Sequence, residues 1–314
     1  MSSSAAVATR PAYRPYAATV VDVHRLSPHF VRVTFGCDDF EYFGTAGLDQ
    51  RIKLILPLAD GTITDIGQRD DAVIDAGDWY AMWRAVPSAV RSPLRTYTVR
   101  RANPDERQVV VDFVVHHDAG PAGAWAASAA VGQKLVIVGP DQRSDFSRQG
   151  LDWHPGTARR VLLAGDETAA PGISGILEAL DETYEVDAFI EVPTGADRLS
   201  LDVPDSFRVT WLARDDREHG AALTEAVAAW SAGAPDVLAR AAAPRAQELA
   251  DVDVDVELLW DSPEDSEGEF YAWMAGEAAM VKGLRRHLVQ GCGVDRKRVA
   301  FMGYWRLGQS ERQE

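Results

Sequence analysis

Cysteine is scarce in this chain of 314 residues, which holds only Cys37 and Cys292. The two lie far apart without Cys-x-x-Cys spacing, so the chain cannot itself hold an iron–sulfur cluster, which takes four ligands. Scarce cysteine fits a reducing compartment, and we expect a cytoplasmic protein. Residues 1–10 lack the apolar core of a signal peptide. No run of 18 apolar residues occurs, so we expect no stable membrane insertion.

Basic residues are also in short supply, with 32 Lys and Arg against 48 Asp and Glu and a net charge of −16. Such a field repels phosphate polymers and anionic lipid, which argues against a nucleic-acid-binding protein. The charges are unevenly placed: residues 251–269 carry nine acids and no base, whereas residues 281–312 carry eight bases and two acids. A local basic patch suits a small anionic ligand, although a solvated helix face would produce the same pattern.

Some motifs of catalysis are missing as well. The chain has neither His-Glu-x-x-His nor Gly-x-Ser-x-Gly, so the sequence predicts neither that type of zinc site nor a nucleophile elbow. We therefore expect no metal held by protein side chains.

The first half of the chain reads as strands. β-Branched and aromatic residues fill six stretches separated by turn residues, with one helical stretch over 122–130. These stretches are 17–23, 30–35, 52–58, 94–100, 109–116 and 134–138. They predict a six-stranded antiparallel β-barrel domain over residues 12–155. The connection 59–92 is long and places Trp79 and Trp83 in a helix or lid.

The second half alternates strands with helices. Expected strands cover 161–164, 186–192, 207–212, 270–275 and 299–304, and expected helices follow the first of them up to 180 and cover 221–230 and 277–290. This alternation predicts a doubly wound parallel sheet with helices on both faces over residues 156–314. Residues 231–255 interrupt the pattern as an insertion or an extra helix.

The tetrapeptide Arg95-Thr96-Tyr97-Thr98 carries the first chemical signal. On a strand, Arg95 and Tyr97 share one face and the two threonines take the other. A guanidinium fork beside a flat ring is suited to clamp a diphosphate and cover a planar heterocycle, as a flavin dinucleotide requires. The alternative is an ordinary edge strand with a surface arginine.

Two strand–turn–helix junctions in the second half carry the second signal. In the first junction, Gly165 permits a tight turn, and Thr168 is expected to cap the following helix with its hydroxyl. Asp166 and Glu167 there would repel a diphosphate, or else compensate the helix dipole. In the second junction, Gly276 would let a nicotinamide approach the backbone. The common Gly-x-Gly-x-x-Gly fingerprint is absent.

Together with 112–116, 120–126, 139–140 and 303–306, these segments resemble the siderophore-interacting protein family of FAD-dependent ferric-siderophore reductases. That family is a branch of the ferredoxin-reductase-like flavoproteins, and the resemblance covers nearly the whole chain. It implies FAD as cofactor, NAD(P)H as co-substrate and an anionic ferric siderophore as partner. We expect a monomer.

The resemblance also assigns the flavin site. Arg95 matches the residue on the FAD diphosphate, Tyr97 the aromatic on the isoalloxazine, and Thr98 a contact near flavin N5, with Thr96 between them. His116 matches a histidine close to the flavin. The second flavin-phosphate turn corresponds to Gly120, Ala122, Gly123, Ala124 and Trp125, where Gly123 departs from the family's frequent serine.

The nicotinamide and substrate sites follow in the same way. Residues matching the NAD(P)H site are Gly165, Asp166, Glu167, Thr168, Gly276 and Glu277. Glu191 would favour NADH by binding a ribose hydroxyl, whereas Arg198 and Arg214 would favour a 2′-phosphate, so the choice stays open. Basic residues matching the family's chelate pocket are Lys53, Arg143 and Arg306. Lys53 also fits an ordinary outward-facing strand lysine.

The resemblance implies hydride transfer from NAD(P)H to FAD, then single-electron reduction of Fe(III) and release of Fe(II). One alternative is another ferredoxin-reductase-like flavin reductase or oxygenase reductase. An alternative of a different class is a non-catalytic siderophore-binding protein, which would hold the chelate without flavin.

Overall fold

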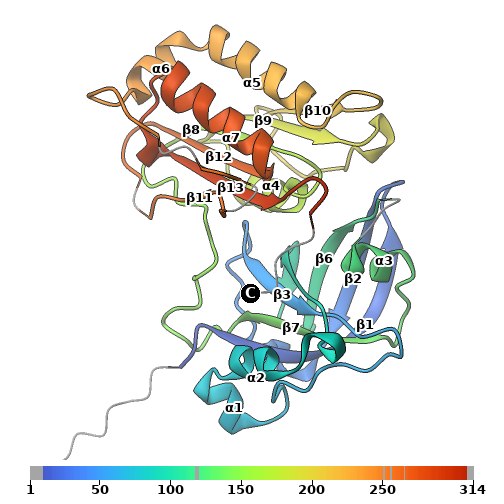
Figure 1. Cartoon of the computed structure of the whole chain (residues 1–314). Coiled ribbons are helices and arrows are strands. Elements are labelled where there is room, and N and C mark those ends of the chain that lie inside the picture. The colour runs from blue at the N-terminus through green and yellow to red at the C-terminus, as the bar shows by residue number, and fades with distance from the viewer. Residues whose placement is uncertain (1–9, 117–119, 250–251, 255–256, 265, 310–314) are drawn as a thin grey trace, which may run out of the picture. The chain divides into compact units, whose positions relative to one another are not determined.

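The computed structural model describes residues 10–116, 120–249, 252–254, 257–264 and 266–309. The chain forms two compact units (Figure 1). The first comprises Met1–His24, Arg32–Phe113 and Pro121–Gly150, and the second comprises Arg25–Val31, Val114–Gly120 and Leu151–Glu314. Among the described residues, no helix is long and apolar enough to cross a membrane.

The first unit is built on a curved seven-stranded sheet with the strand order β4-β3-β7-β1-β2-β6-β5 (Figure 1). The prediction of six strands was wrong. The additional strand, β5, has only the three residues Arg101–Asn103, which is too short and polar for an alternating pattern to appear. The other strands are β1 Tyr13–Arg25, β2 Phe30–Gly36, β3 Arg51–Ile55, β4 Leu94–Thr98, β6 Gln108–Val114 and β7 Lys134–Pro140.

The long connection after β3 forms a cover over part of this sheet. It contains α1 Asp71–Ala76, α2 Trp79–Ala85 and the short 3₁₀ turn η2 Ser88–Val90. Trp83 of α2 is buried and donates its indole N–H to the carbonyl of Ser92 at 3.0 Å. Trp83 packs in one apolar cluster with residues of β3, β4 and β7: Ile55, Leu94, Val136 and Val138. The remaining helix of this unit, α3, spans Pro121–Ala127.

The second unit contains a six-stranded sheet with the strand order β10-β9-β8-β12-β13-β11. Its strands are β8 Arg160–Gly165, β9 Glu185–Val192, β10 Arg208–Ala213, β11 Trp260–Asp261, β12 Phe270–Glu277 and β13 Val299–Trp305. The prediction of a wholly parallel sheet was wrong at one edge, because β11 pairs antiparallel with β13. A two-residue strand leaves no periodic signal in the sequence.

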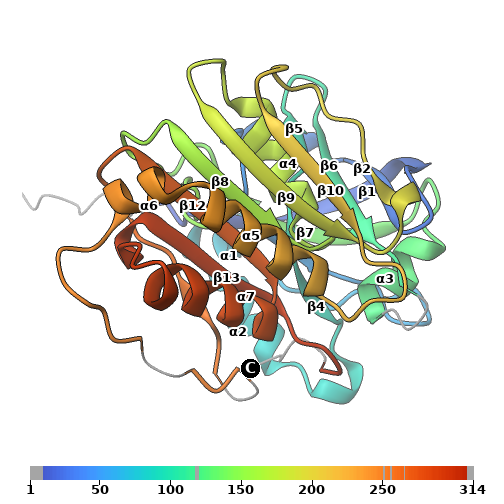
Figure 2. The same ribbon diagram turned by 90° about the horizontal axis from the view of Figure 1, so that it is seen from above.

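Helices lie on both faces of this sheet. They are α4 Ala170–Ala179, α5 Ala221–Gly233, α6 Pro235–Ala241 and α7 Ala278–Arg285, with a π-helical turn over Arg286–Gly291. Leu162 and Ala164 of β8 belong to the core that contains α5, α6 and α7 (Figure 2). The next strand position, Gly165, instead lies against Ile173 of α4. Because alternate residues face opposite sides of a strand, α4 covers the other face.

The strand order reverses direction between β8 and β12, which are neighbours at the middle of the sheet. In a doubly wound sheet, ligands bind beyond the carboxyl ends of the strands at such a switch point. Gly165 ends β8 and Glu277 ends β12, so both predicted nicotinamide junctions meet there.

Candidate functional site

The carboxyl group of Asp166 occupies the switch point. Its Oδ2 accepts hydrogen bonds from the backbone N–H of Glu277 at 2.7 Å and from the indole of Trp305 at 2.9 Å. Its Oδ1 accepts from the N–H and hydroxyl of Thr168, at 2.9 and 2.6 Å. Asp166 is fully buried, and a buried carboxylate is tolerated only when such donors surround it. One side chain therefore ties together the ends of β8, β12 and β13.

Glu167, the next residue, is the centre of a buried ion-pair chain. Arg214 donates two hydrogen bonds to it, at 2.9 and 3.0 Å, in bidentate geometry. The same guanidinium donates at 3.1 Å to Glu191, the penultimate residue of β9. Both carboxyl groups are fully buried. Two predicted determinants of nucleotide choice, Glu191 and Arg214, are thus paired with each other.

Two histidines border these acids. Nε2 of His219 lies 3.4 Å from Oδ2 of Asp166 and 3.8 Å from Oε2 of Glu167. Nε2 of His116 lies 3.5 Å from Oε1 of Glu167. The His219 ring also meets the Trp305 ring edge-on, with centroids 5.1 Å apart. His116, which the resemblance places near the flavin, is therefore half-buried beside the acid cluster of the second unit.

The pKa values of these groups are displaced in different directions. Burial raises the pKa of Asp166, and the neighbouring Glu167 charge adds to that rise. Burial acts in the same sense on Glu167, but His219 and the Arg214 guanidinium outweigh it and lower its pKa to about 2. Burial lowers the pKa of His116, whereas for His219 the two acids overcome burial and raise the pKa. The cluster therefore holds Glu167 ionised and makes His219 easier to protonate than a histidine in solvent.

These acids do not fit a metal ion. One potential ligand atom from each of Asp166, Glu167 and His219 lies within 4.8 Å of the others. However, the oxygens of Asp166 already accept four hydrogen bonds, and Arg214 covers both oxygens of Glu167. A cation at this point would have to displace the guanidinium.

The structure corrects the expected role of Thr168. Its hydroxyl donates to Asp166 two residues earlier, and helix α4 has Ala169 at its N-cap with no side-chain capping bond. Short side chains of Asp and Thr commonly bond locally in this way. The acids at this turn therefore bind donors of the surrounding strands and loops.

The backbone conformation and close packing at position 276 require glycine, whether or not a ligand binds there. Its φ is +142°, and a Cβ placed there would lie 2.6 Å from Oδ2 of Asp166 and 2.7 Å from the terminal methyl of Met280. Any side chain would displace the Asp166 carboxylate from the Glu277 N–H. The nicotinamide contact predicted at Gly276 stays a prediction.

Glu277 itself caps a helix. Its Oε2 accepts from the N–H of Met280 in the first turn of α7, at 2.9 Å, and Oε1 accepts from the N–H of Leu307 at 3.3 Å. On the same helix, one basic side chain is not on the surface. Arg285 is buried and pairs with Asp261 of the edge strand β11 at 3.0 Å.

Sequence reasoning missed the site roles of His219 and Trp305. His219 follows the carboxyl end of β10, and Trp305 is the last residue of β13. Because those ends share one edge of the sheet, the strand order would have placed them beside Asp166. That order requires the fold, since nothing in the local sequence around His219 marks it.

In the first unit, the two predicted flavin segments meet at one aromatic cluster. The Tyr97 ring lies 4.6 Å from the ring of Phe113, which in turn lies 5.5 Å from Trp125. Trp125 also stacks on Phe35 at 6.1 Å. The tetrapeptide on β4 and helix α3 are therefore adjacent.

Register places Arg95 opposite Leu54 and Tyr97 opposite Ile52, whereas Thr96 lies opposite Lys53. The ammonium group of Lys53 donates to the Thr96 hydroxyl at 2.6 Å. Lys53 and Thr96 thus occupy the strand face opposite to Arg95 and Tyr97. Thr98 is buried, while Arg95, Thr96 and Tyr97 are half-buried.

The second predicted flavin turn leads into helix α3. Gly120 and Ala124 are exposed, whereas Ala122 and Gly123 are buried against the unit. The indole N–H of Trp125 is buried and has no hydrogen-bond partner among the residues that the structure describes. A buried donor without a partner is costly in a folded protein, so a ligand acceptor at this point would stabilise it.

The two remaining predicted substrate residues are already engaged. Arg143 forms a bidentate pair with the buried Asp141, at 2.6 and 2.8 Å, and lies 3.8 Å over the ring of Tyr42. Arg306 is half-buried and donates to the carbonyl of Glu257 at 2.5 Å. The carboxylate neutralises much of the Arg143 charge, which makes Arg143 a weaker candidate for binding an anion.

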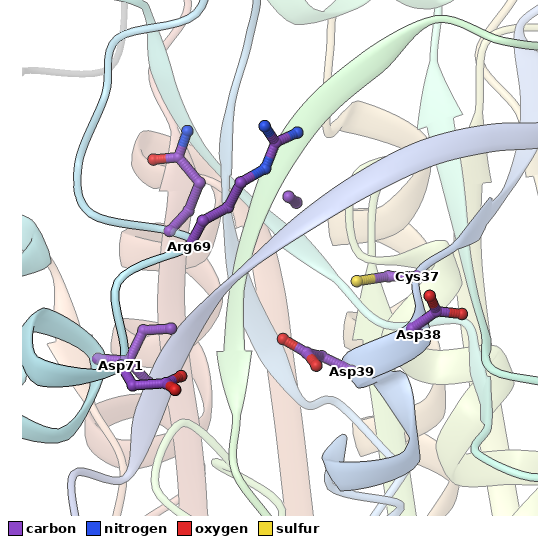
Figure 3. A pocket seen from close by; sticks show the side chains of 8 residues that line it. Cys37, Asp38, Asp39, Arg69 and Asp71 are labelled. Carbon is purple, nitrogen blue, oxygen red and sulfur yellow. The ribbon is translucent and has the colours of Figure 1, made fainter.

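A separate cavity of about 350 Å³ opens beside α1 in the first unit (Figure 3). The lining is polar and includes the side chains of Cys37, Asp38, Asp39, Arg69 and Asp71. None of the predicted flavin, nicotinamide or substrate residues lines it. Its excess of carboxylates does not suit an anionic ligand.

Comparison with known proteins agrees with this geometry. Residues 19–144 match the siderophore-interacting FAD-binding domain, and residues 158–308 match the siderophore-interacting protein domain. An uncharacterized protein of Mycobacterium tuberculosis is 33% identical over 300 residues, covering 94% of this chain and 92% of that protein. The chain belongs to the siderophore-interacting protein family. It is also 28% identical to the ferric vibriobactin reductase ViuB of Vibrio cholerae, over 91% of this chain and 87% of ViuB.

Solved structures show the same architecture. A siderophore utilization protein from T. fusca superposes with a TM-score of 0.67 at 27% identity, over 96% of each chain. The fold alone extends to a ferredoxin NADP+ reductase from Neisseria gonorrhoeae, with a TM-score of 0.56 at 14% identity over 94% of this chain and all of that one. The fold is ferredoxin-reductase-like, and FAD is the cofactor of the first domain. The face of Arg95 and Tyr97 and the unpartnered Trp125 indole fit that cofactor.

The ion-pair chain predicts a large difference between two neighbouring arginines. Arg214→Met would leave Glu167 and Glu191 buried without their cation, and we expect a loss of about 3–5 kcal/mol in the free energy of unfolding. Arg217→Met removes only an exposed pair with Glu225 and should change it by less than about 1 kcal/mol. Urea denaturation followed by circular dichroism measures both. Equal losses of unfolding free energy in the two variants would contradict a buried ion-pair chain centred on Arg214.

The raised pKa of His219 predicts a pH dependence. A group whose pKa is higher in the folded state stabilises that state fully below its unfolded pKa and loses the effect as pH rises through the folded pKa. His219→Asn should therefore destabilise the protein by about 1 kcal/mol at pH 6, and the difference from wild type should shrink by pH 9. Urea midpoints at both pH values test this, with His24→Asn as an exposed control. A difference that grows toward pH 9 would refute it.

Proposed function

We propose that this protein is an FAD-containing, NAD(P)H-dependent ferric-siderophore reductase that acts in the cytoplasm. The observation that carries the proposal is the meeting of the β4 tetrapeptide and helix α3 at Phe113, on a chain similar throughout to ViuB. A flavin site joined to an α/β unit with a switch point suits electron transfer from a nicotinamide donor.

Bound FAD supplies the chemistry, because it accepts two electrons as a hydride and gives them up singly to Fe(III). The protein side chains hold the cofactor in position. In this proposal Arg95 holds the diphosphate, Tyr97 covers the isoalloxazine, and Trp125 donates its indole N–H to the cofactor. Thr98 and the backbone of Gly120–Trp125 complete the site. No side chain is required to act as nucleophile or general acid.

The substrate is proposed to be an anionic ferric chelate. Lys53 and Arg306 are the cations that bind it, while Arg143 contributes less because Asp141 neutralises its charge. Reduction releases the metal because Fe(II) binds hard oxygen ligands more weakly than Fe(III) does. Substrate capture and cofactor binding therefore rest on different residues.

Two other functions fit parts of the structure. Another ferredoxin-reductase-like flavin reductase or oxygenase reductase would share the flavin site but would not need the chelate-binding cations. A non-catalytic siderophore-binding protein would need those cations without the flavin. The aromatic cluster with its unpartnered indole favours a flavoprotein over the second alternative.

The visible spectrum tests the proposal directly. The purified protein should show flavin bands near ~450 nm, which bleach anaerobically with NADH or NADPH and return when a ferric catecholate chelate is added. Fe(II) trapped by ferrozine should match the electrons supplied. Absence of flavin would favour the binding protein. Bleaching without reoxidation by any ferric chelate would favour a different reductase.

If Lys53 and Arg306 bind the chelate and not the flavin, replacing them should change the KM for the chelate without changing FAD content. Lys53→Ala and Arg306→Ala should each raise the KM for the ferric chelate by about 3–10-fold, as expected for losing one charged contact, with FAD content unchanged. Lys134→Ala and Arg296→Ala, which remove exposed cations from the same two units, serve as matched controls. If all four variants behave alike, general surface charge rather than a pocket accounts for chelate binding.

A further inference from the structure

Three helices begin at the carboxyl edge of the second unit's sheet, and each meets one of the chain's own carboxyl groups there. The helices are α4, α5 and α7, and the acids are Asp166, Glu191 and Glu277. Helix N-termini at this edge are where a dinucleotide diphosphate ordinarily binds, because their N–H groups are unpaired. In this protein those groups are largely occupied.

The start of α4 offers few free donors. The backbone N–H groups of Ala169 and Ala170 both donate to the carbonyl of Asp166, at 3.0 and 3.1 Å. The N–H of Thr168 donates to its carboxylate, and the next helical residue, Pro171, has no N–H. A phosphate approaching this turn would also meet the buried carboxyl groups of Asp166 and Glu167.

Carboxylates also occupy backbone donors at the other two helix starts. Both oxygens of Glu191 accept backbone bonds at the start of α5, from Gly220 at 2.8 Å and Leu223 at 3.1 Å. Glu277 accepts from Met280 at the start of α7. Arg214, the half-buried guanidinium of the ion-pair chain at this edge, is held by Glu167 and Glu191, whose two negative charges already exceed its single positive charge.

From these contacts we infer that the second unit recognises the dihydronicotinamide riboside part of its electron donor and leaves the phosphates in solvent. This inference rests on the proposed function. The charge of the sheet edge supports the inference. When the donor loses a hydride to FAD, its neutral dihydronicotinamide ring becomes a pyridinium cation. An edge rich in carboxyl groups favours that cation and disfavours phosphate. NADH and NADPH would then be accepted about equally.

Three donors that differ in their phosphates test the inference on the FAD-loaded protein. NADPH carries three phosphates, NADH carries two, and 1,4-dihydronicotinamide riboside carries none. We expect kcat/KM for anaerobic flavin bleaching to agree within about fivefold among the three. An advantage of more than about 30-fold for NADH or NADPH over the riboside would overturn the inference while leaving the reductase function intact. If dithionite bleaches the flavin but none of the three donors does, both the inference and the proposed donor fail.

A matched pair of variants tests whether the Glu191 carboxylate is the group that disfavours the donor's phosphates. Glu191→Gln removes a buried negative charge at the start of α5, and Glu225→Gln removes an exposed one from the same helix. We expect Glu191→Gln to raise kcat/KM at least threefold for NADH and NADPH, with less than a twofold change for the riboside. Glu225→Gln should leave all three within twofold. A change in Glu191→Gln that is equal for all three donors would contradict exclusion of phosphate by this carboxylate.

Discussion

The buried carboxyl group of Asp166 is the contact on which the second unit depends. It accepts from the end of β12 through the Glu277 N–H, from the end of β13 through Trp305 and from its own turn through Thr168. Buried in this way, the group is stable only while these donors remain in place, so the strand ends are held in one arrangement. Gly276 follows from the same demand, because a side chain there would collide with the carboxylate.

Glu167 is a second buried acid beside Asp166, and two neighbouring carboxylates repel each other unless a cation compensates them. Glu167 is kept ionised by Arg214, and the two acids raise the pKa of the neighbouring His219. Arg214 in turn is shared with Glu191, which also holds the start of α5. Glu167, Arg214 and Glu191 therefore hold one another in place. In our inference, the carboxyl edge of this sheet is acidic and disfavours phosphate. This is why residues that appear suited to adenosine recognition in the sequence are structural in the fold.

Periodic patterns in the sequence predicted most strands and helices, but elements without a period were invisible. β5 and β11 have three and two residues, too few to alternate. The burial of Arg285 has no signal in the sequence, because its partner Asp261 lies on one of those short strands. At the site, motif resemblance located Asp166 and Glu167. His219 and Trp305 needed the strand order, since only the sheet brings residues so distant in sequence to one edge.

The net charge of −16 sets a limit on how an anionic chelate can be captured. Long-range attraction opposes approach, so binding must come from cations that touch the ligand, within a screening length of about 8–10 Å. A cation already paired at hydrogen-bond distance adds little, as with Arg143 and its carboxylate partner Asp141. Lys53 donates to the Thr96 hydroxyl and Arg306 to the Glu257 carbonyl. If the proposed chelate binds here, its capture therefore depends on the few cations that touch it rather than on the net charge of the chain.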